Sequence, residues 1–550
     1  MLKRLLIPLI LLGTVFVSAQ ERPLTRAEAT NYAETSLYAD VLDFIHQLQP
    51  LTPHMRVESM GQTAGGLDIP LLIIGDPVPV QPSDLLQDGR IPLYFQANIH
   101  AGEVEGKEAA LMLIRDLLAE AKPRFLDRFV LLVAPIFNAD GNDQLSPNNR
   151  RDNGPELAGI RYNGWNLDLN RDGMKQESPE MRALMDRVFL RWDPLLFVDC
   201  HTTNGSYHDE PVTYLWPANP NGDEAIIDYM VDRMMPDIRK RLKKEYNTLS
   251  IPYGNYRNPR KPEEGWVAAG AEPRYLTNYY GLRNRFSILL ENYAYADFKT
   301  RVWGNYHFLL SVLEYCDAHL DEMRAMTRQA DLATIRRGQR PSETDSFAVA
   351  FKEVPLGRSI TIQGYELDEI KDERGRMRLS KSDRKAVYEV PLFHRYVATQ
   401  KVRMPAGYLI QLNDPAVIEN LLGHGILVEQ LEAELKMEVE AFQITEVQPA
   451  TNPYGGGVRS NQGHYLNTVQ GKTQNVEKVF SPGTFYVPTG QPLGDLAAYL
   501  LEPQSDDGLL LWNFFDRYIT AQWGRQALDY PVYKCYEPVT APRRTVERDR

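Results

Sequence analysis

Two short polar clusters carry the residue types of a metal site. In the first, residues 98–103, His100 and Glu103 are separated by two residues, so both side chains can reach one metal ion from a tight turn that Gly102 is expected to allow. In the second, residues 199–205, His201 can bring a third ligand to the same place. Two histidines and one glutamate leave the fourth zinc position open to water, which is the arrangement of catalytic zinc sites.

The spacing of His100 and Glu103 occurs again in the chain, at His319 and Glu322. The second pair follows an apolar helix pattern and has charged neighbours, so we interpret it as a solvated helix end. The first pair follows an apolar strand pattern instead. Taken alone, His201 is more simply a hydrogen-bonded core histidine, and its place at the end of another strand is what makes it a candidate ligand.

A third cluster, residues 166–172, has the residue types that bind a carboxylate. In an extended segment, alternation places Asp168 and Asn170 on one face. Arg171 beside Asn170 suits a carboxylate, because its planar guanidinium can bond both oxygens. The alternative is a surface ion pair between Arg171 and Asp172.

A fourth cluster begins with Glu291, which directly follows the apolar run 286–290. A carboxylate next to a buried strand loses hydration unless it has a partner or a chemical task. Glu291 is therefore either a catalytic acid–base group or an exposed carboxylate at a strand end.

These clusters need a framework that holds them together, and the hydrophobic pattern indicates one. Amphipathic patterns predict helices over residues 38–48, capped by Thr35, and over 106–117, and a further helix begins at Ser178-Pro179. The expected strands are residues 69–74, 93–99, 129–136, 195–199 and 286–290. This alternation predicts an α/β fold, a mixed twisted sheet with helices on both faces. Such sheets build their sites at the carboxyl ends of strands, where the four clusters lie.

A polar break at residues 337–342 separates this part from a second region. There the runs 347–351 and 359–363 predict strands, a helix begins at Asp414-Pro415 and ends at Gly423, and the glycine- and asparagine-rich residues 454–484 are expected to be loop. The expected parts are a signal peptide (1–19), a catalytic domain (20–335) and a smaller β-rich α+β C-terminal domain of unknown role (345–550).

The N-terminus has the pattern of an export signal. Lys3 and Arg4 precede a short apolar stretch, residues 5–17, and small side chains precede a cleavage point near Ala19. We expect a periplasmic or secreted protein with no stable membrane span after cleavage; the alternative is an uncleaved anchor. The net charge of −12 argues against a nucleic-acid partner. The 3 cysteines allow at most one disulfide, and the sequence leaves open whether it forms.

In this order the clusters resemble the carboxypeptidase A-like family of zinc metallopeptidases. The matching features are His-x-x-Glu after one strand, Asn-Ala-Asp-Gly at 138–141 after the next, Asn170-Arg171, a distant histidine after a strand and a late glutamate after the last strand. The resemblance covers roughly residues 23–320. Residues 274–299 and the C-terminal extension resemble an exported bacterial branch of the family.

The resemblance implies a role for each residue. One zinc ion per chain is bound by His100, Glu103 and His201, and Glu291 is the general base that activates the attacking water. Asn170 and Arg171 hold the terminal carboxylate of the substrate, Asp168 lies behind the first zinc histidine, and Arg150, favoured among residues 149–151, polarises the scissile carbonyl. The implied activity is that of an exported zinc metallocarboxypeptidase, which hydrolyses the last bond of a peptide with a free C-terminus.

Two features depart from the family pattern. Residues 202–205, Thr-Thr-Asn-Gly, resemble zinc deacylases of the aspartoacylase kind, so a zinc amidohydrolase acting on an acyl-amino acid or a cell-wall peptide is the alternative. The family's tyrosine that closes over the substrate is not placed among Tyr275, Tyr279 and Tyr280. The loop 253–273 is expected to line the pocket and leaves the preferred side chain open. A non-enzymatic peptide-binding relative is disfavoured, because all three ligands and the base are present.

Overall fold

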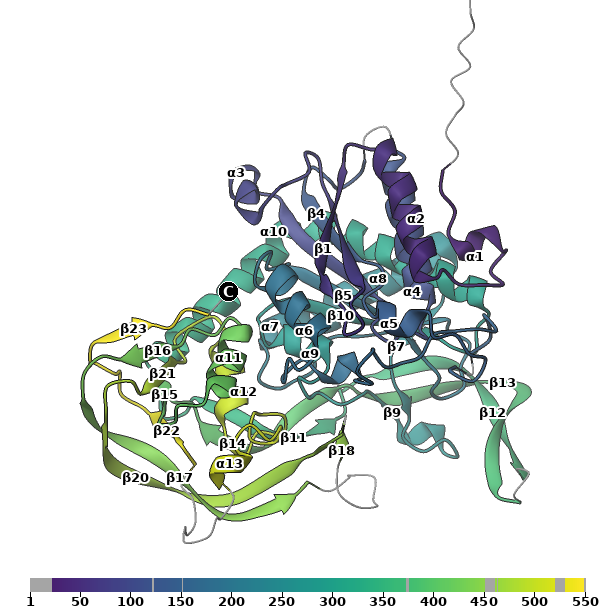
Figure 1. The fold of residues 1–550 in the computed structure, drawn as a ribbon. Coiled ribbons are helices and arrows are strands. Elements are labelled where there is room, and N and C mark those ends of the chain that lie inside the picture. The colour runs from purple at the N-terminus through teal and green to yellow at the C-terminus, as the bar shows by residue number, and fades with distance from the viewer. Residues whose placement is uncertain are drawn as a thin grey trace, which may run out of the picture.

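The computed structural model describes residues 22–120, 123–150, 152–371, 375–450, 460–461, 463–519 and 530–548. The expected signal peptide lies outside these residues. We call residues 22–339 the N-terminal region and residues 346–548 the C-terminal region (Figure 1). The exact domain boundaries expected from the sequence stay predictions. Among the described residues, none of the helices is both long enough and apolar enough to span a membrane.

The N-terminal region is built on one sheet of eight strands in the order β1-β2-β4-β3-β5-β10-β6-β7. The strands are β1 (Met55–Gln62), β2 (Asp68–Ile74), β3 (Ile91–Ala97), β4 (Phe129–Ala134), β5 (Leu196–Thr203), β6 (Val212–Leu215), β7 (Ser250–Pro252) and β10 (Phe286–Tyr293). The central pairs β4–β3, β3–β5 and β5–β10 are parallel, whereas β1–β2, β2–β4 and β10–β6 are antiparallel. The predicted mixed sheet is therefore confirmed.

An apolar core covers each face of this sheet. Neighbouring residues of a strand point to opposite faces, so each strand contributes side chains to both cores. In β2, Leu72 and Ile74 belong to one apolar core, and Leu71 and Ile73 belong to the other. The first core contains residues of α2 (Tyr38–Leu48), α4 (Glu105–Leu118), α8 (Met235–Tyr246) and α10 (Phe298–Gln339). The second contains residues of α6 (Pro179–Leu184), α9 (Leu276–Gly281) and the C-terminal region. Burial on both faces explains the continuous apolar runs of the central strands.

Two strands extend further than their apolar runs predict. β5 continues through His201 to Thr203, and β10 continues through Glu291 to Tyr293, so neither residue lies after its strand. Pairing with neighbouring strands carries the ladder past the apolar residues, and Glu291 is the direct register partner of His201. The sheet thus sets two candidate catalytic side chains beside each other.

Two expectations about helices are wrong. Leu37, not Thr35, is the N-cap of α2, and the carboxylate of Asp40 accepts the Leu37 backbone N–H at 2.8 Å. Thr35 instead donates a hydrogen bond to Glu108 at 2.8 Å. His319 lies inside the 42-residue helix α10 rather than at its end, because buried apolar residues continue on one side of the helix beyond it.

The C-terminal region contains a seven-stranded sheet in the order β20-β17-β22-β15-β21-β16-β23. Its strands are β15 (Gly407–Ile410), β16 (Glu429–Leu431), β17 (Leu435–Pro449), β20 (Asn467–Phe480), β21 (Phe485–Pro488), β22 (Val532–Cys535) and β23 (Arg543–Thr545). The helix α11 (Pro415–Gly423) is as predicted. The loop expected over 454–484 is wrong where β20 forms, since pairing with β17 along the strand outweighs the composition; residues 454–459 and 462 are outside the described part.

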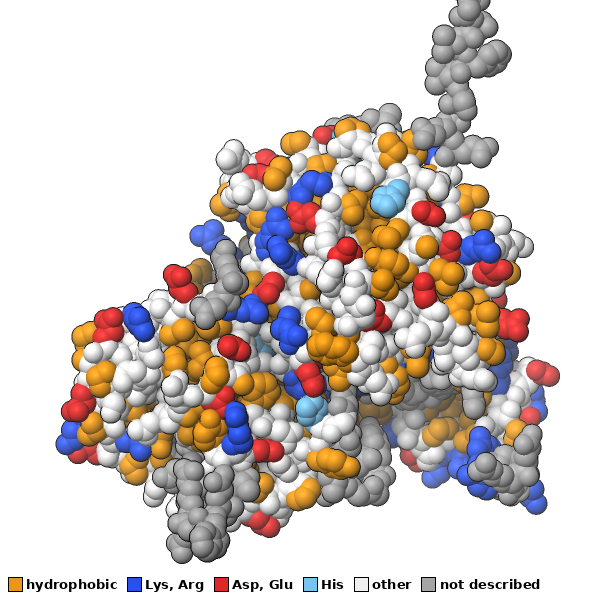
Figure 2. All heavy atoms as spheres, in the orientation of Figure 1, with side chains coloured by type: hydrophobic (Ala, Val, Ile, Leu, Met, Phe, Trp, Pro, Cys, Tyr) orange, Lys and Arg blue, Asp and Glu red, His pale blue; other side chains and the backbone are white. Residues whose placement is uncertain are grey.

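A long hairpin of β12 (Ser359–Lys371) and β13 (Met377–Phe393) reaches from the C-terminal region beneath the N-terminal region (Figure 1). It joins the two regions directly, because β13 pairs with β9 (Trp266–Val267) of the N-terminal region. Basic side chains gather toward its tip, at the lower right of Figure 2. Arg384 is ion-paired with Glu366 and Asp368 of the opposite strand, so part of this charge is neutralised within the hairpin.

Glycine allows α4 to approach the strand that carries His201. A Cβ added to Gly106 would lie 2.5 Å from the Cβ of Cys200 on β5, which is too close for any real side chain. Cys200 is free and buried, as are Cys316 and Cys535. The turn that leads into α4 carries His100 and Glu103, so this contact sets their distance from His201.

Gly106→Ala is expected to lower the free energy of unfolding by about 1–3 kcal/mol, because the new methyl group overpacks the contact between α4 and β5. It should also weaken zinc binding. Gly338→Ala is the matched control: its Cβ would lie 2.2 Å from the carbonyl carbon of Thr489, remote from the predicted metal site. Thermal unfolding and zinc titration check the pair. Equal zinc affinity of the two variants would contradict the role given to Gly106.

Candidate active site

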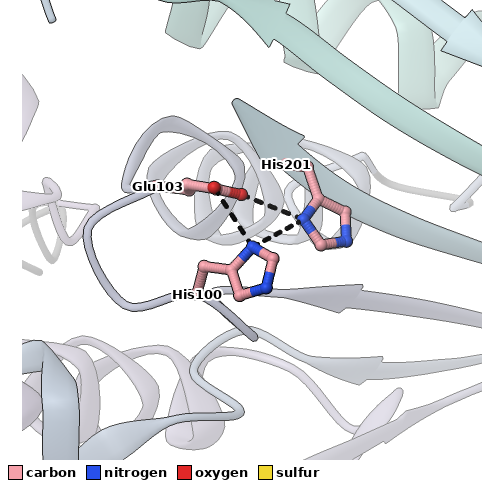
Figure 3. A group of neighbouring side chains, drawn as sticks. All are labelled: His100, Glu103 and His201. Carbon is pink, nitrogen blue, oxygen red and sulfur yellow. Dashed lines mark hydrogen bonds and ion pairs between the residues drawn. The ribbon is translucent and has the colours of Figure 1, made fainter. Parts of the chain in front are cut away.

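The structure brings His100, Glu103 and His201 together as a buried group (Figure 3). His100 lies in the turn after β3, Glu103 lies just before α4, and His201 lies in β5. His100 Nδ1 is 3.1 Å from Glu103 Oε1, His201 Nδ1 is 2.9 Å from Glu103 Oε2, and the two Nδ1 atoms are 3.3 Å apart. Three potential ligand atoms therefore converge on one point.

The turn between His100 and Glu103 does not depend on Gly102 in the expected way. The left-handed residue at the start of the turn is Asn98, with φ of 66°. Gly102 is needed because its Cβ would lie 2.7 Å from the carbonyl oxygen of Gly159 and 2.8 Å from Cγ of Arg150. The glycine thus allows two other segments to pack against the metal-site turn.

Carboxylates hold the far side of both imidazole rings. His100 Nε2 lies 3.0 Å from Asp168 Oδ1, and His201 Nε2 lies 2.9 Å from Asp199 Oδ2. When each Nε2 donates its N–H to a carboxylate, each Nδ1 is left with a lone pair. Two lone pairs and the Glu103 carboxylate then face one another, which is favourable only with a cation between them.

The donor set and its spacing fit zinc. Ligands about 2.0–2.1 Å from a tetrahedral zinc ion lie about 3.3–3.4 Å from one another. The 3.3 Å between the Nδ1 atoms of His100 and His201 matches that separation. With Glu103 as the third protein ligand, one coordination position is left for water or substrate, as in catalytic zinc sites.

The charges around the group favour a bound cation. Burial alone raises the pKa of Glu103, but the charges of His100 and Arg150 and hydrogen bonds from both histidines hold it well below its usual range. Burial lowers the pKa of His201, but Asp199 and Glu103 outweigh this effect and raise it well above its ordinary value. Both shifts reflect a point that attracts positive charge, whether protons or a metal ion.

A cavity of about 260 Å³ opens onto this group. Its lining includes the predicted site residues His100, Glu103, Arg150, Asn170, Arg171 and Glu291. Oε2 of Glu291 is buried and has no hydrogen-bond partner among the residues that the structure describes. Burial raises the pKa of Glu291 to about 8; His201 opposes the shift and Glu103 adds to it. An unpartnered carboxylate oxygen beside a metal site is suited to accept a proton.

The two residues predicted to bind a carboxylate do not lie in an extended segment. Leu169–Arg171 forms a 3₁₀ turn, which Asp168 begins by accepting the Asn170 backbone N–H at 3.1 Å. The turn still directs both side chains to the cavity. Asn170 Oδ1 accepts the backbone N–H of Leu276 at 3.1 Å, and the Arg171 guanidinium lies over the Tyr275 ring at 4.4 Å.

The predicted alternative for Arg171, an ion pair with Asp172, does not match the structure. Asp172 is fully buried and accepts hydrogen bonds from Ser178 and from the backbone N–H of Glu177. Arg150 lies on the metal side of the cavity, where its Nη1 donates to Glu103 Oε1 at 3.0 Å. Its Nη2 donates to the carbonyl of Thr202, also at 3.0 Å.

Two residues of the site were not found from the sequence. Asp199 lies two residues before His201 on the same strand, so strand alternation could have revealed it. Arg161 donates to Asp168 Oδ2 at 2.8 Å and lines the cavity beside Arg150. The loop 253–273 is expected from the sequence to line the pocket, and its residues Tyr253, Ala269 and Gly270 do line the cavity.

The structure shows which of the three candidate tyrosines faces the cavity, a choice that the sequence left open. Tyr275 lines the cavity. Tyr279 and Tyr280 are fully buried in the core; the Tyr280 hydroxyl donates to the carbonyl of Pro194, and the Tyr279 hydroxyl lies 2.8 Å from His424 Nδ1. Of these three, only Tyr275 is placed to meet a substrate.

Comparison with known proteins agrees with this geometry. Residues 41–272 match the family model described as zinc carboxypeptidase. The chain carries a domain of the zinc carboxypeptidase family. The resemblance predicted from the sequence is thereby confirmed, and the matched domain together with the carboxypeptidase relatives supports a metallopeptidase. The matched residues contain all three candidate zinc ligands and end before Glu291.

Curated relatives resemble the chain well beyond the matched zinc carboxypeptidase domain. Carboxypeptidase 2 of Trichophyton rubrum is 23% identical over 458 residues, which are 78% of this chain and 76% of that protein. Carboxypeptidase 2 of Trichophyton equinum is 23% identical over 469 residues, which are 81% and 76%. Among solved structures, a putative carboxypeptidase A from Shewanella denitrificans has 19% identity and a TM-score of 0.40, covering 52% of this chain and 69% of that chain.

Removing one histidine of the candidate metal site should remove the metal. His100→Ala and His201→Ala each delete one of three ligands, so purified variants should lose bound zinc and peptidase activity, as measured by elemental analysis and peptide hydrolysis. His319→Ala is the control, because His319 has the same spacing to Glu322 but only a 3.7 Å ion pair on α10. Loss of zinc in His319→Ala, with zinc retained in His100→Ala, would refute the site.

Proposed function

We propose that this protein is a zinc carboxypeptidase that releases the last residue of peptides with a free C-terminus. The observation that carries this proposal is the placement of Arg171 and Asn170 in the same cavity as Glu291 and the metal-binding group. A carboxylate-binding arginine next to a hydrolytic centre restricts cleavage to the end of a chain, because the terminal carboxylate must occupy that arginine.

Substrate binding rests on a prearranged guanidinium. Arg171 has five N–H donors, of which one is given to the carbonyl oxygen of Asn170 at 2.8 Å. The ring of Tyr275 supports the guanidinium from one face through a cation–π contact. A planar group fixed in this way can bond both oxygens of a terminal carboxylate with little further loss of side-chain entropy.

The chemistry requires both a Lewis acid and a base. Zinc held by His100, Glu103 and His201 would supply the polarisation of the scissile carbonyl and the lowered pKa of the attacking water. Glu291 Oε2 accepts the proton from that water and delivers it to the leaving amine. Burial raises the pKa of Glu291 to about 8, and the charges of His201 and Arg150 act against this rise; a zinc ion bound beside it would lower the pKa further, toward the ionised form that a base needs.

Arginines face the same part of the cavity. Arg150, with Arg161 beside it, supplies positive charge where the carbonyl oxygen becomes negative in the transition state. Arg150 is already held by its hydrogen bonds to Glu103 and Thr202, so its charge is in position before substrate binds. The Arg150 side chain is mostly buried, so water screens its charge less than that of an exposed arginine.

We also propose export to the periplasm or the medium. The support is the sequence alone: Lys3 and Arg4, the apolar residues 5–17 and the small residues that precede a cleavage point near Ala19.

Amidating the C-terminus of a substrate peptide should abolish its cleavage, because the amide cannot form the charged pair with Arg171. Arg171→Ala should lower kcat/KM by an amount equivalent to about 2–4 kcal/mol, the range for losing one partner of a desolvated charge pair. The control is Arg328→Ala on the exposed surface of α10. It should change neither the kcat/KM for the free peptide nor the resistance of the amidated peptide to cleavage. Mass spectrometry of paired free and amidated peptides measures cleavage by the wild-type protein and by both variants.

Equal cleavage of free and amidated peptides would rule out a carboxypeptidase. Turnover of acyl-amino acids, in place of peptides, would instead favour the zinc amidohydrolase alternative. The same assay therefore distinguishes the two hydrolases, which need the same metal and base.

Glu291→Gln keeps the size of the side chain but removes the basic oxygen. General-base catalysis contributes about 10²- to 10⁴-fold, so turnover should fall by at least the lower figure while zinc content stays unchanged. Peptide binding should change little, because Arg171 is untouched. Near-normal turnover would remove Glu291 from the mechanism, and loss of zinc would make it a ligand.

A further inference from the structure

One wall of the cavity is a short segment, residues 268–275, which we call the pocket loop. Ala269, Gly270 and Tyr275 of this loop line the cavity. The Tyr275 ring also supports the Arg171 guanidinium, with 4.4 Å between the guanidinium carbon and the ring centre. The position of the pocket loop therefore affects how Arg171 is presented to a substrate.

The outer side of the pocket loop is bonded to the C-terminal region. The backbone N–H of Arg274, next to Tyr275, donates to Asp507 Oδ2 at 2.5 Å, and Arg274 Nη2 lies 3.0 Å from Asp507 Oδ1. Both side chains are buried, with exposed fractions of 1% and 0%. Trp512 donates to Asp507 Oδ1 at 2.8 Å and orients the carboxylate. One C-terminal carboxylate thus holds both the backbone and the side chain of Arg274.

Further bonds hold the rest of the loop. The Tyr396 hydroxyl of the C-terminal region donates to the carbonyl of Ala269 at 2.6 Å. Asn219 donates to the carbonyl of Ala271 at 2.9 Å and to the Tyr499 hydroxyl at 3.2 Å. The C-terminal region consequently contacts the loop near its start as well as at Arg274.

The inner side of the loop leaves no space for it to move inward. A Cβ on Gly173 would lie 2.9 Å from the carbonyl oxygen of Pro273 and 3.2 Å from that of Arg274, so the two backbones already touch. Leu276, which follows the loop, donates its N–H to Asn170. A displacement at Arg274 is therefore transmitted to Tyr275 and to the carboxylate-binding residues.

The buried ion pair makes this arrangement dependent on the C-terminal region. A buried guanidinium without its carboxylate carries a large desolvation cost, which the chain relieves by exposing it to water. Without the Asp507 carboxylate, Arg274 would keep the carbonyl oxygen of Asp506 and the Trp512 ring but lose its buried ion pair, so we expect it to shift toward water and to move Tyr275 with it. The support given to Arg171 would then be lost although every residue of the metal site was intact.

We propose that Asp507 of the C-terminal region is a positioning residue for substrate binding, acting through Arg274 and Tyr275 on Arg171. This inference rests on the proposed carboxypeptidase function. It gives the C-terminal region a role in catalysis, because the carboxylate-binding side of the cavity is complete only when that region is docked.

The test compares Asp507→Asn with Asp495→Asn in the full chain. Asp495 is also a buried aspartate of the C-terminal region. It forms an ion pair with Arg337 of α10, away from the cavity. Asp507→Asn should raise KM for a free C-terminal peptide about tenfold, with kcat changed less and zinc content unchanged. Asp495→Asn should lower the melting temperature but leave KM unchanged. Equal KM in the two variants would overturn the inference.

A milder pair of variants decides the matter if Asp507→Asn does not fold. Tyr396→Phe removes the hydrogen bond to Ala269 while keeping the ring, and it should raise KM about two- to fivefold, the effect of one neutral hydrogen bond. Tyr530→Phe removes an equivalent bond, from a buried hydroxyl to the Leu501 carbonyl at 2.9 Å, inside the C-terminal region. An unchanged KM in Tyr396→Phe would overturn the inference. A wild-type protein that releases no C-terminal residue would overturn the proposed function first, and this inference with it.

Discussion

Two imidazole nitrogens and a carboxylate that face one another in a buried site repel unless a cation lies between them. His100, Glu103 and His201 are held in this arrangement by Asp168 and Asp199, which bond the far side of each ring. The carboxylates fix the orientation of both rings and direct their lone pairs to a common point. The electrostatics of the cavity, including the low pKa of Glu103, follow from that arrangement.

The sheet and its helices hold the side chains of the metal site at fixed distances from one another. Parallel pairing of β5 with β10 places Glu291 beside His201, and the close contact of Gly106 with Cys200 sets the turn of Glu103 against β5. Backbone ladders and close-packed backbones change little with side-chain motion, so they are suited to hold a site to within fractions of an ångström. The groups that must meet the substrate, by contrast, come from a 3₁₀ turn and from loops.

Those loops are stabilised from outside the N-terminal region. β9 pairs with β13, and Arg274 is buried against Asp507, so segments on either side of residues 268–273 are fixed by the C-terminal region. A loop that is anchored in this way loses less conformational entropy when a substrate binds. The two regions also share an apolar core beneath the sheet, which makes their docking part of folding rather than an optional contact.

The sequence by itself determined the residue types of the metal site, five of the eight strands of the N-terminal sheet and the resemblance to the zinc carboxypeptidase family, because these depend on spacings of a few residues and on hydrophobic periodicity. It misplaced the ends of β5 and β10, missed β20 and could not choose among the tyrosines. Only the tertiary structure identified Asp199 and Arg161 as neighbours of the site, and only it joined Arg274 to Asp507 across 233 residues. Such contacts depend on strand order and on the docking of two regions, which no local pattern records.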